Sequence, residues 1–588
     1  MKLVFGEGSC GIAAGARKVR NAIEKLNTDG AVEIGITGCI GMCYLEPIVD
    51  VYDGDTLVKR FVRVQEKDAE RIYKAVVESG HAGRVTLPEL ADLEISADDK
   101  EFLEKQTRIA LRHCGLIDPE DISAYSSVDG YKAIRKVLSG MSPEDVIAEI
   151  KTSGLAGRGG AGFPTWFKWN AARNAKGDQK YLICNADEGD PGAFMDRAVI
   201  ESDPHSLIEG MLIAAYAIGA TKAFVYVRAE YPLAIVRLEK ALADARKNNL
   251  LGDNILGSNF SCDIRIKAGA GAFVCGEETA LIESLEGNRG MPRLKPPFPA
   301  EKGYTQAPSN INNVETFANV AWIILNGGAA FAAMGTETSK GTKVFALTGK
   351  IRRGGLVEIP MGLTLRDVIF DIGGGIRDGG TFKAVQMGGP SGGCIPEHLL
   401  DTKIDYKALG ATGAIMGSGG MVVMDSHTCM VNMARFFLDF TAKESCGKCV
   451  HCRIGTKRMH EILTRITEGK GKEGDVELLQ ELCNGIKAGA LCGLGQTAPN
   501  PVLTTIRYFR DEYDAHIREG RCPAHECAAL KKYSIDPAKC KGCTMCAKKC
   551  PVGAITGTVK QPHVIDQAKC IKCGQCAATC KFGAVAMG

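Results

Sequence analysis

Eight cysteines gathered in the last fifty residues constrain the fold of this 588-residue chain more than any other feature of its sequence. They form two runs, CKGCTMCAKKCP at 540–551 and CIKCGQCAATCK at 570–581, which share the spacing C-x2-C-x2-C-x3-C. Two-residue gaps let successive thiolates surround one iron–sulfur cube, and the fourth cysteine of each run ligates the other cluster. Zinc knuckles and disulfides are the less favoured alternatives. The expected ligand sets of two [4Fe–4S] clusters are Cys540, Cys543, Cys546 and Cys580, and Cys570, Cys573, Cys576 and Cys550.

The composition is that of a multi-domain globular protein. Charged residues make up 24% and hydrophobic residues 45% of the sequence, and the net charge of +3 gives no support for nucleic-acid binding. The first residues lack the basic and apolar segments of a signal peptide, and no run of about 20 apolar residues would span a bilayer. We therefore expect a cytoplasmic protein without membrane contact, in which the 24 cysteines stay reduced and hold metal.

Four glycine-rich and polar stretches in the middle of the chain suggest a cofactor site. They are GLAGRGGAGFPTWFKW at 154–169, CNADEGDPGAF at 184–194, GAGAFVCGEETALIESLEGNRGMPRLKPPFPA at 269–300 and NINNVET at 310–316. Glycine lets backbone N–H groups approach a phosphate or a flat ring. Taken alone, a glycine-rich loop is as often an ordinary turn. The usual dinucleotide fingerprint G-x-G-x-x-G after a strand is not found.

In this order the four stretches resemble the flavin-bearing, NADH-oxidising subunit of respiratory complex I and its soluble relatives, over roughly residues 110–520. The resemblance implies a Rossmann-like domain that binds FMN and NAD(H). Carried over by motif position, the FMN contacts would be Gly157, Gly159, Lys168, Asn185, Asp187, Gly276, Glu277, Asn312 and Asn313. The NAD(H) contacts would be Phe163, Asp190, Glu278, Lys295 and Phe298. Asp190 and Phe273 stand where complex I subunits usually have Glu and Tyr.

The chemistry of individual side chains is consistent with these roles. Lys168 and Arg158 can balance the charge of the FMN phosphate, although a solvated lysine is the simpler interpretation. Phe163 and Phe298 offer flat faces on which adenine can stack, although either could equally be a core residue. Glu278 could accept hydrogen bonds from ribose hydroxyls and repel a 2′-phosphate, which favours NAD over NADP. No acid or base residue is required, because hydride passes directly between nicotinamide and flavin.

A third cluster is expected in a helical bundle that follows the flavin domain. ESCGKCVHC at 444–452 has the spacing C-x2-C-x2-C, and LCGLG brings a further cysteine forty residues later. Between the flavin domain and this bundle, VFALTGKIRRGGLVEIPMGLTLRDVI at 344–369 resembles a ubiquitin-like insert of short strands, for which packing is the expected role. The expected ligands of this [4Fe–4S] cluster are Cys446, Cys449, Cys452 and Cys492.

The segment that joins the bundle to the ferredoxin tail carries Cys522 and Cys527, which none of the three clusters uses. The neutral imidazole of His516 and these two thiolates would need one more ligand to complete a tetrahedral zinc site. Cys429 is the chosen fourth ligand, with His525 and Cys483 as rivals, and free thiols in a linker remain the alternative. The expected zinc ligands are Cys429, His516, Cys522 and Cys527.

The N-terminal residues carry an incomplete cluster signature. GEGSCGIAAGARKV and ITGCIGMC resemble the thioredoxin-like [2Fe–2S] domain, in which four cysteines follow C-x4-C and then C-x3-C. The first of these cysteines falls on Phe5, so a ligand such as Glu7 or Ser9 would be required, or the cluster is absent. Because Cys39 and Cys43 keep the second half of this motif, the sequence favours a bound [2Fe–2S] cluster. The expected thiolate ligands are Cys10, Cys39 and Cys43.

These motifs predict an α/β multi-domain chain. It has a thioredoxin-like head, a Rossmann-like FMN/NAD domain, a ubiquitin-like β-grasp insert, a helical [4Fe–4S] bundle and a two-cluster ferredoxin tail. The predicted domains are 1–84 (head), 85–150 (linker and helices), 151–335 (FMN and NAD), 336–425 (insert), 426–515 (bundle), 516–530 (joint) and 531–588 (ferredoxin).

With its head and tail, the chain resembles the diaphorase (beta) subunit of soluble electron-bifurcating [FeFe]-hydrogenases. That resemblance implies hydride exchange between NAD(H) and FMN, followed by single-electron transfer through the clusters. It also implies three partners: soluble ferredoxin, a catalytic hydrogenase subunit and a small thioredoxin-like [2Fe–2S] subunit. The alternatives are a diaphorase subunit of a formate dehydrogenase or of an NADP-reducing hydrogenase, and a non-enzymatic electron carrier.

Overall fold

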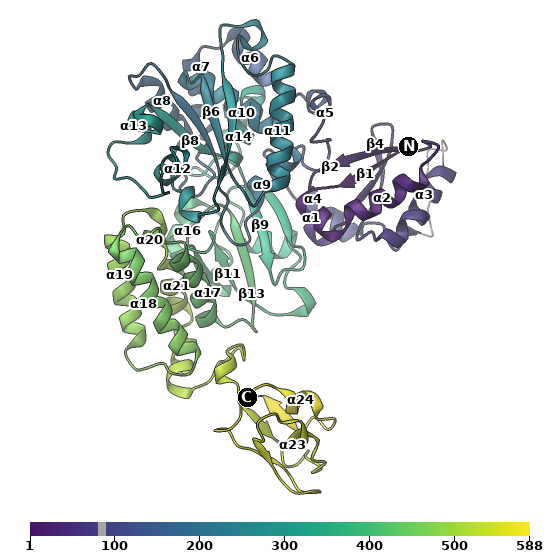
Figure 1. The fold of residues 1–588 in the computed structure, drawn as a ribbon, viewed down its shortest axis with the longest axis vertical. Helices are drawn as coiled ribbons and strands as arrows, with labels where there is room; N and C mark the ends of the chain where they lie inside the picture. Colours follow the sequence, from purple (N-terminus) through teal and green to yellow (C-terminus); the bar gives the residue numbers. More distant parts are fainter. Residues whose placement is uncertain (80–89, 588) are drawn as a thin grey trace. The chain divides into compact units, whose positions relative to one another are not determined.

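The computed structural model describes residues 1–79 and 90–587, which form two compact units (Figure 1). The first unit comprises residues 1–379, 385–392 and 397–423. The second comprises residues 380–384, 393–396 and 424–588. The domain boundary predicted between residues 84 and 85 lies outside the described residues.

A four-stranded sheet in the order β2-β1-β3-β4 forms the centre of the N-terminal domain. β1 is parallel to β2 and antiparallel to β3, which is antiparallel to β4. Phe5 of β1 and Val19 of α2 lie in its core, because alternate strand residues and one helix face are apolar. The elements are β1 (Lys2–Gly6), α1 (Ser9–Ala14), α2 (Ala16–Leu26), β2 (Glu33–Thr37), β3 (Val49–Asp53), β4 (Thr56–Phe61) and α3 (Ala69–Glu78).

Four helices lead from this domain to the central sheet: α4 (Ala97–Glu104), α5 (Ile122–Ser127), α6 (Lys132–Gly140) and α7 (Pro143–Ser153). Local sequence sets both ends of α7. Ser142 and Asp145 form a capping box around Pro143 at its start. Gly154 ends the helix with a left-handed backbone (φ 64°), which glycine adopts without strain. The glycine-rich loop therefore begins where α7 stops.

The central domain contains a parallel four-stranded sheet in the order β7-β6-β5-β8. Helices α10 and α14 are almost wholly buried and pack against each other and against β5. Helices over a parallel sheet are the arrangement that crossover connections produce. The elements are α8 (Thr165–Asn174), β5 (Tyr181–Ala186), α9 (Met195–Ser202), α10 (Pro204–Ile218), β6 (Lys222–Arg228), α11 (Pro232–Lys247), β7 (Asp263–Gly269), α12 (Glu278–Leu285), α13 (Pro299–Lys302), β8 (Ser309–Asn313), α14 (Val314–Asn326) and α15 (Gly328–Ala332).

A mixed five-stranded sheet occupies the region predicted as the β-grasp insert, in the order β10-β9-β13-β11-β12. β9 is antiparallel to β10 and parallel to β13. The elements are β9 (Thr342–Gly349), β10 (Gly355–Pro360), β11 (Phe382–Met387), β12 (Gly393–Pro396), α16 (Tyr406–Thr412) and β13 (Gly420–Asp425).

Helices dominate the second unit before the tail begins. Leu438, Met459, Leu463 and Leu479 belong to their shared core. The helices are α17 (Met430–Lys443), α18 (Val450–Thr467), α19 (Asp475–Gly489), α20 (Gly493–Thr497), α21 (Asn500–Tyr508) and α22 (Arg510–Asp514), followed by the π-helix η10 (Ala515–Glu519). The tail has two small sheets, β14 (Tyr533–Ile535) with β17 (Val585–Met587) and β15 (Ile555–Thr556) with β16 (Val564–Ile565), and the short helices α23 (Met545–Lys549) and α24 (Gln575–Thr579).

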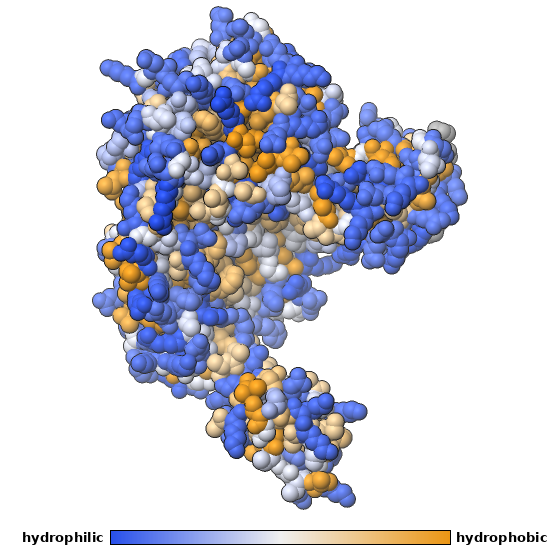
Figure 2. Space-filling model, viewed as in Figure 1, coloured by the Kyte–Doolittle hydropathy of each residue, from blue (hydrophilic) through white to orange (hydrophobic). Residues whose placement is uncertain are grey.

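The viewed face of the molecule is mostly hydrophilic, with apolar patches between (Figure 2). Within residues 1–79 and 90–587, no helix combines the length and the apolar character needed to traverse a bilayer. The apolar helix α10 has only 15 residues and is buried in the core of the first unit.

Candidate functional site

The strand order of the central sheet contains a topological switch point, and the position outside the carboxyl ends of β5 and β8, where a crevice is expected, is here called the crevice. β6 and β7 lie on one side of β5, whereas β8 lies on the other, so the connections diverge between β5 and β8. Asn185 and Asn313 are paired in register at the carboxyl ends of these two strands. In open α/β sheets, ligands bind outside the carboxyl ends of the strands at this topological switch point. The structure thus brings two of the predicted FMN residues to the position where a cofactor is expected.

Asn185 connects this position to a second predicted motif. Its Nδ2 donates to the carbonyl oxygen of Gly276 at 2.9 Å, and its Oδ1 accepts from the backbone N–H of Asp187 at 3.1 Å. Asn313 caps α14, because its Oδ1 accepts from the backbone N–H of Glu315 at 2.9 Å. The two amides therefore organise the backbone around the crevice.

The glycine-rich loop approaches the same position so closely that side chains would obstruct it. A Cβ on Gly159 would lie 3.1 Å from the Cβ of Asn313. A Cβ on Gly162 would lie 2.6 Å from the ring of Tyr406, and its backbone is left-handed (φ 63°). Gly157 closes the loop by donating its N–H to the carbonyl of Phe163 at 2.8 Å. The glycines are thus required by space as well as by backbone conformation.

The predicted phosphate role of Arg158 is wrong. Its side chain is buried, and its guanidinium donates to the carbonyl oxygens of Thr342 at 3.0 Å, Lys340 at 2.7 Å and Ala156 at 3.1 Å. These bonds compensate the buried cation and hold the loop against the β9 segment. Arg158 therefore acts on the protein backbone and is not available to a phosphate.

Lys168, Glu277, Glu278 and Lys295 form a chain of charges beside the crevice. Lys168 Nζ lies 2.9 Å from Glu278 Oε2, and Lys295 Nζ lies 3.0 Å from both Glu278 Oε1 and Glu277 Oε1. Burial alone would raise the pKa of Glu278, but Lys168 and Lys295 outweigh it and lower the pKa to about 2. Glu278 is therefore ionised at neutral pH and already has two cationic partners.

The two predicted stacking residues are exposed and not part of the core. Phe163 is 49% exposed and Phe298 is 54% exposed, which removes the alternative interpretation as packing residues. Phe167, which we did not predict, is 51% exposed and lies edge-to-face with Phe163 at 5.6 Å between ring centroids. Its signal was its position four residues after Phe163, at the start of α8. Exposed aromatic faces of this kind are typical of sites that bind flat rings.

Asp190 and Phe273 lie on neighbouring segments. The ring of Phe273 packs against Gly189, where a Cβ would lie 2.7 Å from it. Asp190 accepts a hydrogen bond from Ser418 Oγ. Burial raises the pKa of Asp190 to about 6, although the bond from Ser418 opposes this shift.

Asn312 lies away from the crevice. It is buried, and its Oδ1 accepts from Trp169 Nε1 at 2.9 Å and from Asn310 Nδ2 at 2.7 Å. Its side chain therefore serves packing between β8 and α8. Adjacent strand residues point to opposite faces, so Asn312 and Asn313 could not both reach one site.

Three of the four predicted cluster ligands of the bundle, here the bundle set, lie at helix starts, and Cys446 lies in the segment before α18. Cys449 caps α18, Cys452 lies in its first turn, and Cys492 caps α20. Burial raises the pKa of Cys452 to about 11, and the nearby thiols of Cys449, Cys492 and Cys446 add to this rise. Cys452 therefore lies near the other three thiols of the bundle set, although the four do not converge within 4.8 Å in the described residues.

Two cavities in the tail correspond to the two crossed ligand sets, here the tail sets. One is lined by thiols that include one from the second run, Cys540, Cys543, Cys546 and Cys580. The other is lined by Cys550, Cys570, Cys573 and Cys576. Each set thus takes three cysteines from one run and the fourth from the other.

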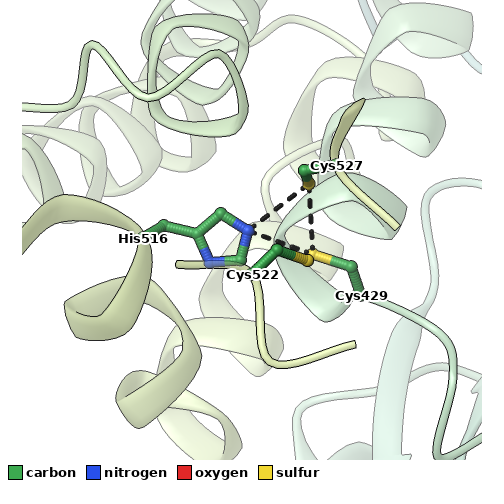
Figure 3. Close-up of side chains that lie close together, drawn as sticks. All are labelled: Cys429, His516, Cys522 and Cys527. Atoms are coloured by element: carbon green, nitrogen blue, oxygen red, sulfur yellow. Dashed lines mark hydrogen bonds between the residues drawn. The ribbon is translucent and has the colours of Figure 1, made fainter. Parts of the chain in front are cut away.

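The four residues predicted to bind zinc, here the joint set, converge in the second unit (Figure 3). His516 Nε2 lies 3.4 Å from the sulfurs of both Cys429 and Cys527, and these sulfurs are 3.7 Å apart. With Cys522, all four are buried, and their ligand atoms lie within 4.8 Å of one another. His516 Nδ1 is hydrogen-bonded to the carbonyl of Glu512 at 2.7 Å, which leaves Nε2 for a metal.

The rival ligands of the joint set lie elsewhere. Cys483 is buried in the bundle, where its sulfur donates to Met459 Sδ at 3.3 Å. His525 is not among the ligand atoms that converge in the described residues.

A second convergence, here the head set, joins Cys10, Cys39 and Cys43 within 4.8 Å. Cys39 Sγ and Cys43 Sγ are 3.7 Å apart. Neither suggested fourth ligand is available. Glu7 is paired with Arg17 at 3.3 Å and Arg20 at 2.6 Å, and Ser9 Oγ donates to Glu201 at 2.5 Å.

Comparisons with known families match three separate parts of the chain. The Nuo51 FMN-binding domain matches residues 150–322. The iron–sulfur binding region of NADH-ubiquinone oxidoreductase-F matches residues 432–516, and a 4Fe-4S dicluster domain matches residues 532–581. The predicted order of a flavin domain, an iron–sulfur region and a ferredoxin-type tail is confirmed at this level.

Individual proteins are similar over most of their length. The HndC subunit of the NADP-reducing hydrogenase of Solidesulfovibrio fructosivorans is 62% identical over 460 residues, 78% of this chain and 94% of that protein. The F 2 subunit of the NADH-quinone oxidoreductase of Rhizobium meliloti (strain 1021) is 48% identical over 417 residues, 71% of this chain and 99% of that protein. Among solved structures, an air-oxidized NAD+-reducing [NiFe]-hydrogenase aligns with a TM-score of 0.62 and 30% identity, over 88% of this chain and 85% of that chain.

Proposed function

We propose that this chain, which belongs to the family of FMN-binding, iron–sulfur subunits of NADH-quinone oxidoreductases and hydrogenases, exchanges hydride between NAD(H) and FMN and passes electrons singly through three [4Fe–4S] clusters. The observation that carries the proposal is the crevice between β5 and β8. There Asn185, Asn313 and the glycine-rich loop converge at the topological switch point.

The residues at the crevice suit a flavin nucleotide. Because Gly159 and Gly162 lack side chains, the loop backbone packs directly against Asn313 and Tyr406, next to the position proposed for the flavin nucleotide. Lys168, which is paired with Glu278 and donates to the carbonyl of Ile311, is the cation that would balance the phosphate charge. FMN, when bound, supplies the step from two-electron to one-electron chemistry.

The residues around the crevice also suit a nicotinamide dinucleotide. Phe163 and Phe298 present exposed faces for adenine, and Phe167 extends this aromatic surface. Glu278 can accept hydrogen bonds from ribose hydroxyls while it remains paired with Lys168 and Lys295. Asp190 holds its place next to Phe273 through Ser418. The chain would then position the nicotinamide and flavin rings for direct hydride transfer, and no side chain needs to donate or accept a proton.

The bundle set and the two tail sets would carry electrons away from the flavin, one at a time. The joint set fits zinc, whose preference for four tetrahedral thiolate and imidazole ligands matches its donors. We further propose soluble ferredoxin, a catalytic hydrogenase subunit and a small thioredoxin-like [2Fe–2S] subunit as partners, with electron bifurcation as the overall reaction. Similarity to a hydrogenase subunit supports the hydrogenase partner.

The test is NADH-dependent reduction of a viologen dye by the purified full-length chain under anaerobic conditions. Gly162→Leu should abolish FMN retention and dye reduction, because the side chain would collide with Tyr406. Gly140→Ala, at an open helix position, is the matched control and should retain both. Bound FMN without dye reduction in the wild-type chain would contradict the proposal and favour an electron carrier.

NADP is the second candidate substrate, because the HndC relative is named as part of an NADP-reducing hydrogenase. The pairing of Glu278 with Lys168 and Lys295 favours it too, since two lysines beside the carboxylate weaken its repulsion of a 2′-phosphate. Comparison of kcat/KM for NADH and NADPH decides between the two. A higher kcat/KM for NADPH would identify NADPH, and not NADH, as the substrate.

A further inference from the structure

We propose that the head set, completed by Glu46, binds a single tetrahedral zinc ion. The cluster signature in the sequence accounts for three thiols of this site but leaves its fourth position open. The structure contains a carboxylate there that the sequence motifs did not reveal.

Glu46 points its carboxylate at one of the thiols, Cys10, and is not among the ligand atoms that already converge within 4.8 Å. It follows η1 (Cys43–Leu45), and its Oε1 lies 3.8 Å from Cys10 Sγ. The backbone N–H of Ile48 holds Oε2 at 3.0 Å, which fixes the direction of the side chain. Two glycines make room for it: a Cβ on Gly11 would lie 3.0 Å from Oε2, and a Cβ on Gly6 would lie 3.3 Å from it.

No cation compensates this carboxylate. Within the described residues, no lysine, arginine or histidine nitrogen forms an ion pair with Glu46, which is only partly exposed. The neighbouring Arg60 donates both of its bonds to Asp50, at 2.7 Å each. A largely buried carboxylate without a partner is costly, and buried charges in proteins are either paired or coordinate metals. A metal ion held by the three thiols would supply the compensating charge.

The spacing of the sulfurs indicates one ion and not a two-iron cluster. Ligands about 2.3 Å from a tetrahedral zinc are separated by about 3.8 Å. The pairs Cys39–Cys43 at 3.7 Å and Cys10–Glu46 at 3.8 Å match this value, but two ligands of one tetrahedral iron would match it too. The distance that discriminates is that of Cys10 from the Cys39–Cys43 pair, and all three thiols lie within 4.8 Å of one another. Two irons with bridging sulfides would hold two ligand pairs further apart. The [2Fe–2S] cluster implied by the resemblance therefore does not fit this set.

Two further features support a closed structural site. Phe5 stands where the family has its first cysteine, and it is fully buried in the core of the sheet, where it cannot ligate. The backbone N–H of Gly41 donates to Cys39 Sγ at 3.3 Å, the kind of outer contact that stabilises a metal-bound thiolate. Gly41 and Tyr44 also pair with the β10 segment, since Gly41 O accepts from Leu356 N at 2.9 Å and Tyr44 N donates to Gly354 O at 3.2 Å. The ion would thus hold the loop that docks the head domain on β10.

The test measures zinc, iron and acid-labile sulfide in the full-length chain, purified anaerobically. The wild-type chain should contain about two zinc ions, one each in the head and joint sets, with about 12 iron atoms in three cubane clusters. Cys39→Ser should remove one zinc ion without loss of iron. Glu46→Ala should release zinc to a chelator about 10-fold faster or more. Glu33→Ala, an exposed carboxylate on β2, is the control and should change neither value.

The joint zinc belongs to the proposed function, so the head variants are also made in a Cys522→Ser background. There the remaining zinc should show three sulfur and one oxygen neighbours by X-ray absorption, and Cys39→Ser should remove it. If the joint site held no zinc, the wild-type value would be one, and the head variants would still lower it to none. Loss of two irons and two sulfides in Cys39→Ser with zinc unchanged would overturn the proposal, as would zinc and iron contents that stay constant. FMN content checks that each variant is folded.

Discussion

The joint set and the tail sets use the same thiol chemistry, but their sulfurs lie at different distances from one another. In the joint set, ligand atoms converge within 4.8 Å. Among the described residues, no three tail thiols lie as close, and each tail set instead lines a cavity. A single ion draws its ligands to one centre, whereas a cube of iron and sulfide keeps them apart. The difference teaches that sulfur spacing separates structural sites from electron-carrying ones.

The largest expected effect comes from a thiol of the bundle set, which, like the tail sets, does not converge within 4.8 Å in the described residues. Cys492→Ala removes one ligand of the bundle set, so iron content should fall by about four atoms per chain. NADH should still bleach the flavin, while onward dye reduction should fall about 100-fold or more, because the first carrier is lost. Anaerobic stopped-flow absorbance follows both steps separately. Unimpaired dye reduction would show that this set carries no electrons.

An intermediate effect is expected for a thiol of the joint set, whose ligand atoms lie within 4.8 Å of one another. Cys522→Ser should remove about one zinc ion per chain and leave the iron content unchanged. Proteolysis within residues 516–530 should become faster, because a metal site contributes directly to local folding. Metal analysis and timed trypsin digestion measure these changes. If NADH-dependent reduction of the flavin slowed in parallel, the assignment of a structural role would be wrong.

The smallest effect is expected for a thiol that belongs to neither kind of set. Cys483 is buried in the bundle, where its sulfur contacts Met459. Cys483→Ala should retain all zinc and iron and lower the free energy of unfolding by only about 1 kcal/mol. Metal analysis with thermal unfolding tests this, and the variant is the matched control for Cys492→Ala. Loss of zinc would show that sulfur spacing does not identify the ligands.

How much could be predicted from sequence depends on how local the information is. The tail ligands lie within eleven residues of one another in each run, so spacing alone predicts their grouping. Cys429 is far along the chain from His516, and its choice depended on a count of unused cysteines. Glu46 escaped prediction because a carboxylate outside the cysteine spacing carries no signature. It became visible only when the fold placed it beside Cys10.

Burial explains the other differences. Arg158 stands in a glycine-rich loop where a cation suits a phosphate, yet the fold turns it inward to three backbone carbonyls. Asn312 and Asn313 look equivalent in sequence, but the alternation of a strand sends Asn312 into the core beside Trp169 and Asn313 to the opposite face, where its Nδ2 donates to Asp196. The parallel sheet itself follows from the motif order that the family shares.

Tyr406 has a consequence for the modularity of the protein. It comes from α16, in the region of the mixed sheet, and its hydroxyl donates to the carbonyl of Gly157 at 3.1 Å while its ring lies behind Gly162. The glycine-rich loop is therefore supported jointly by two regions that differ in sheet architecture. A chimera that transplants only the parallel-sheet domain would leave this loop without its backing, so the two must be inherited together.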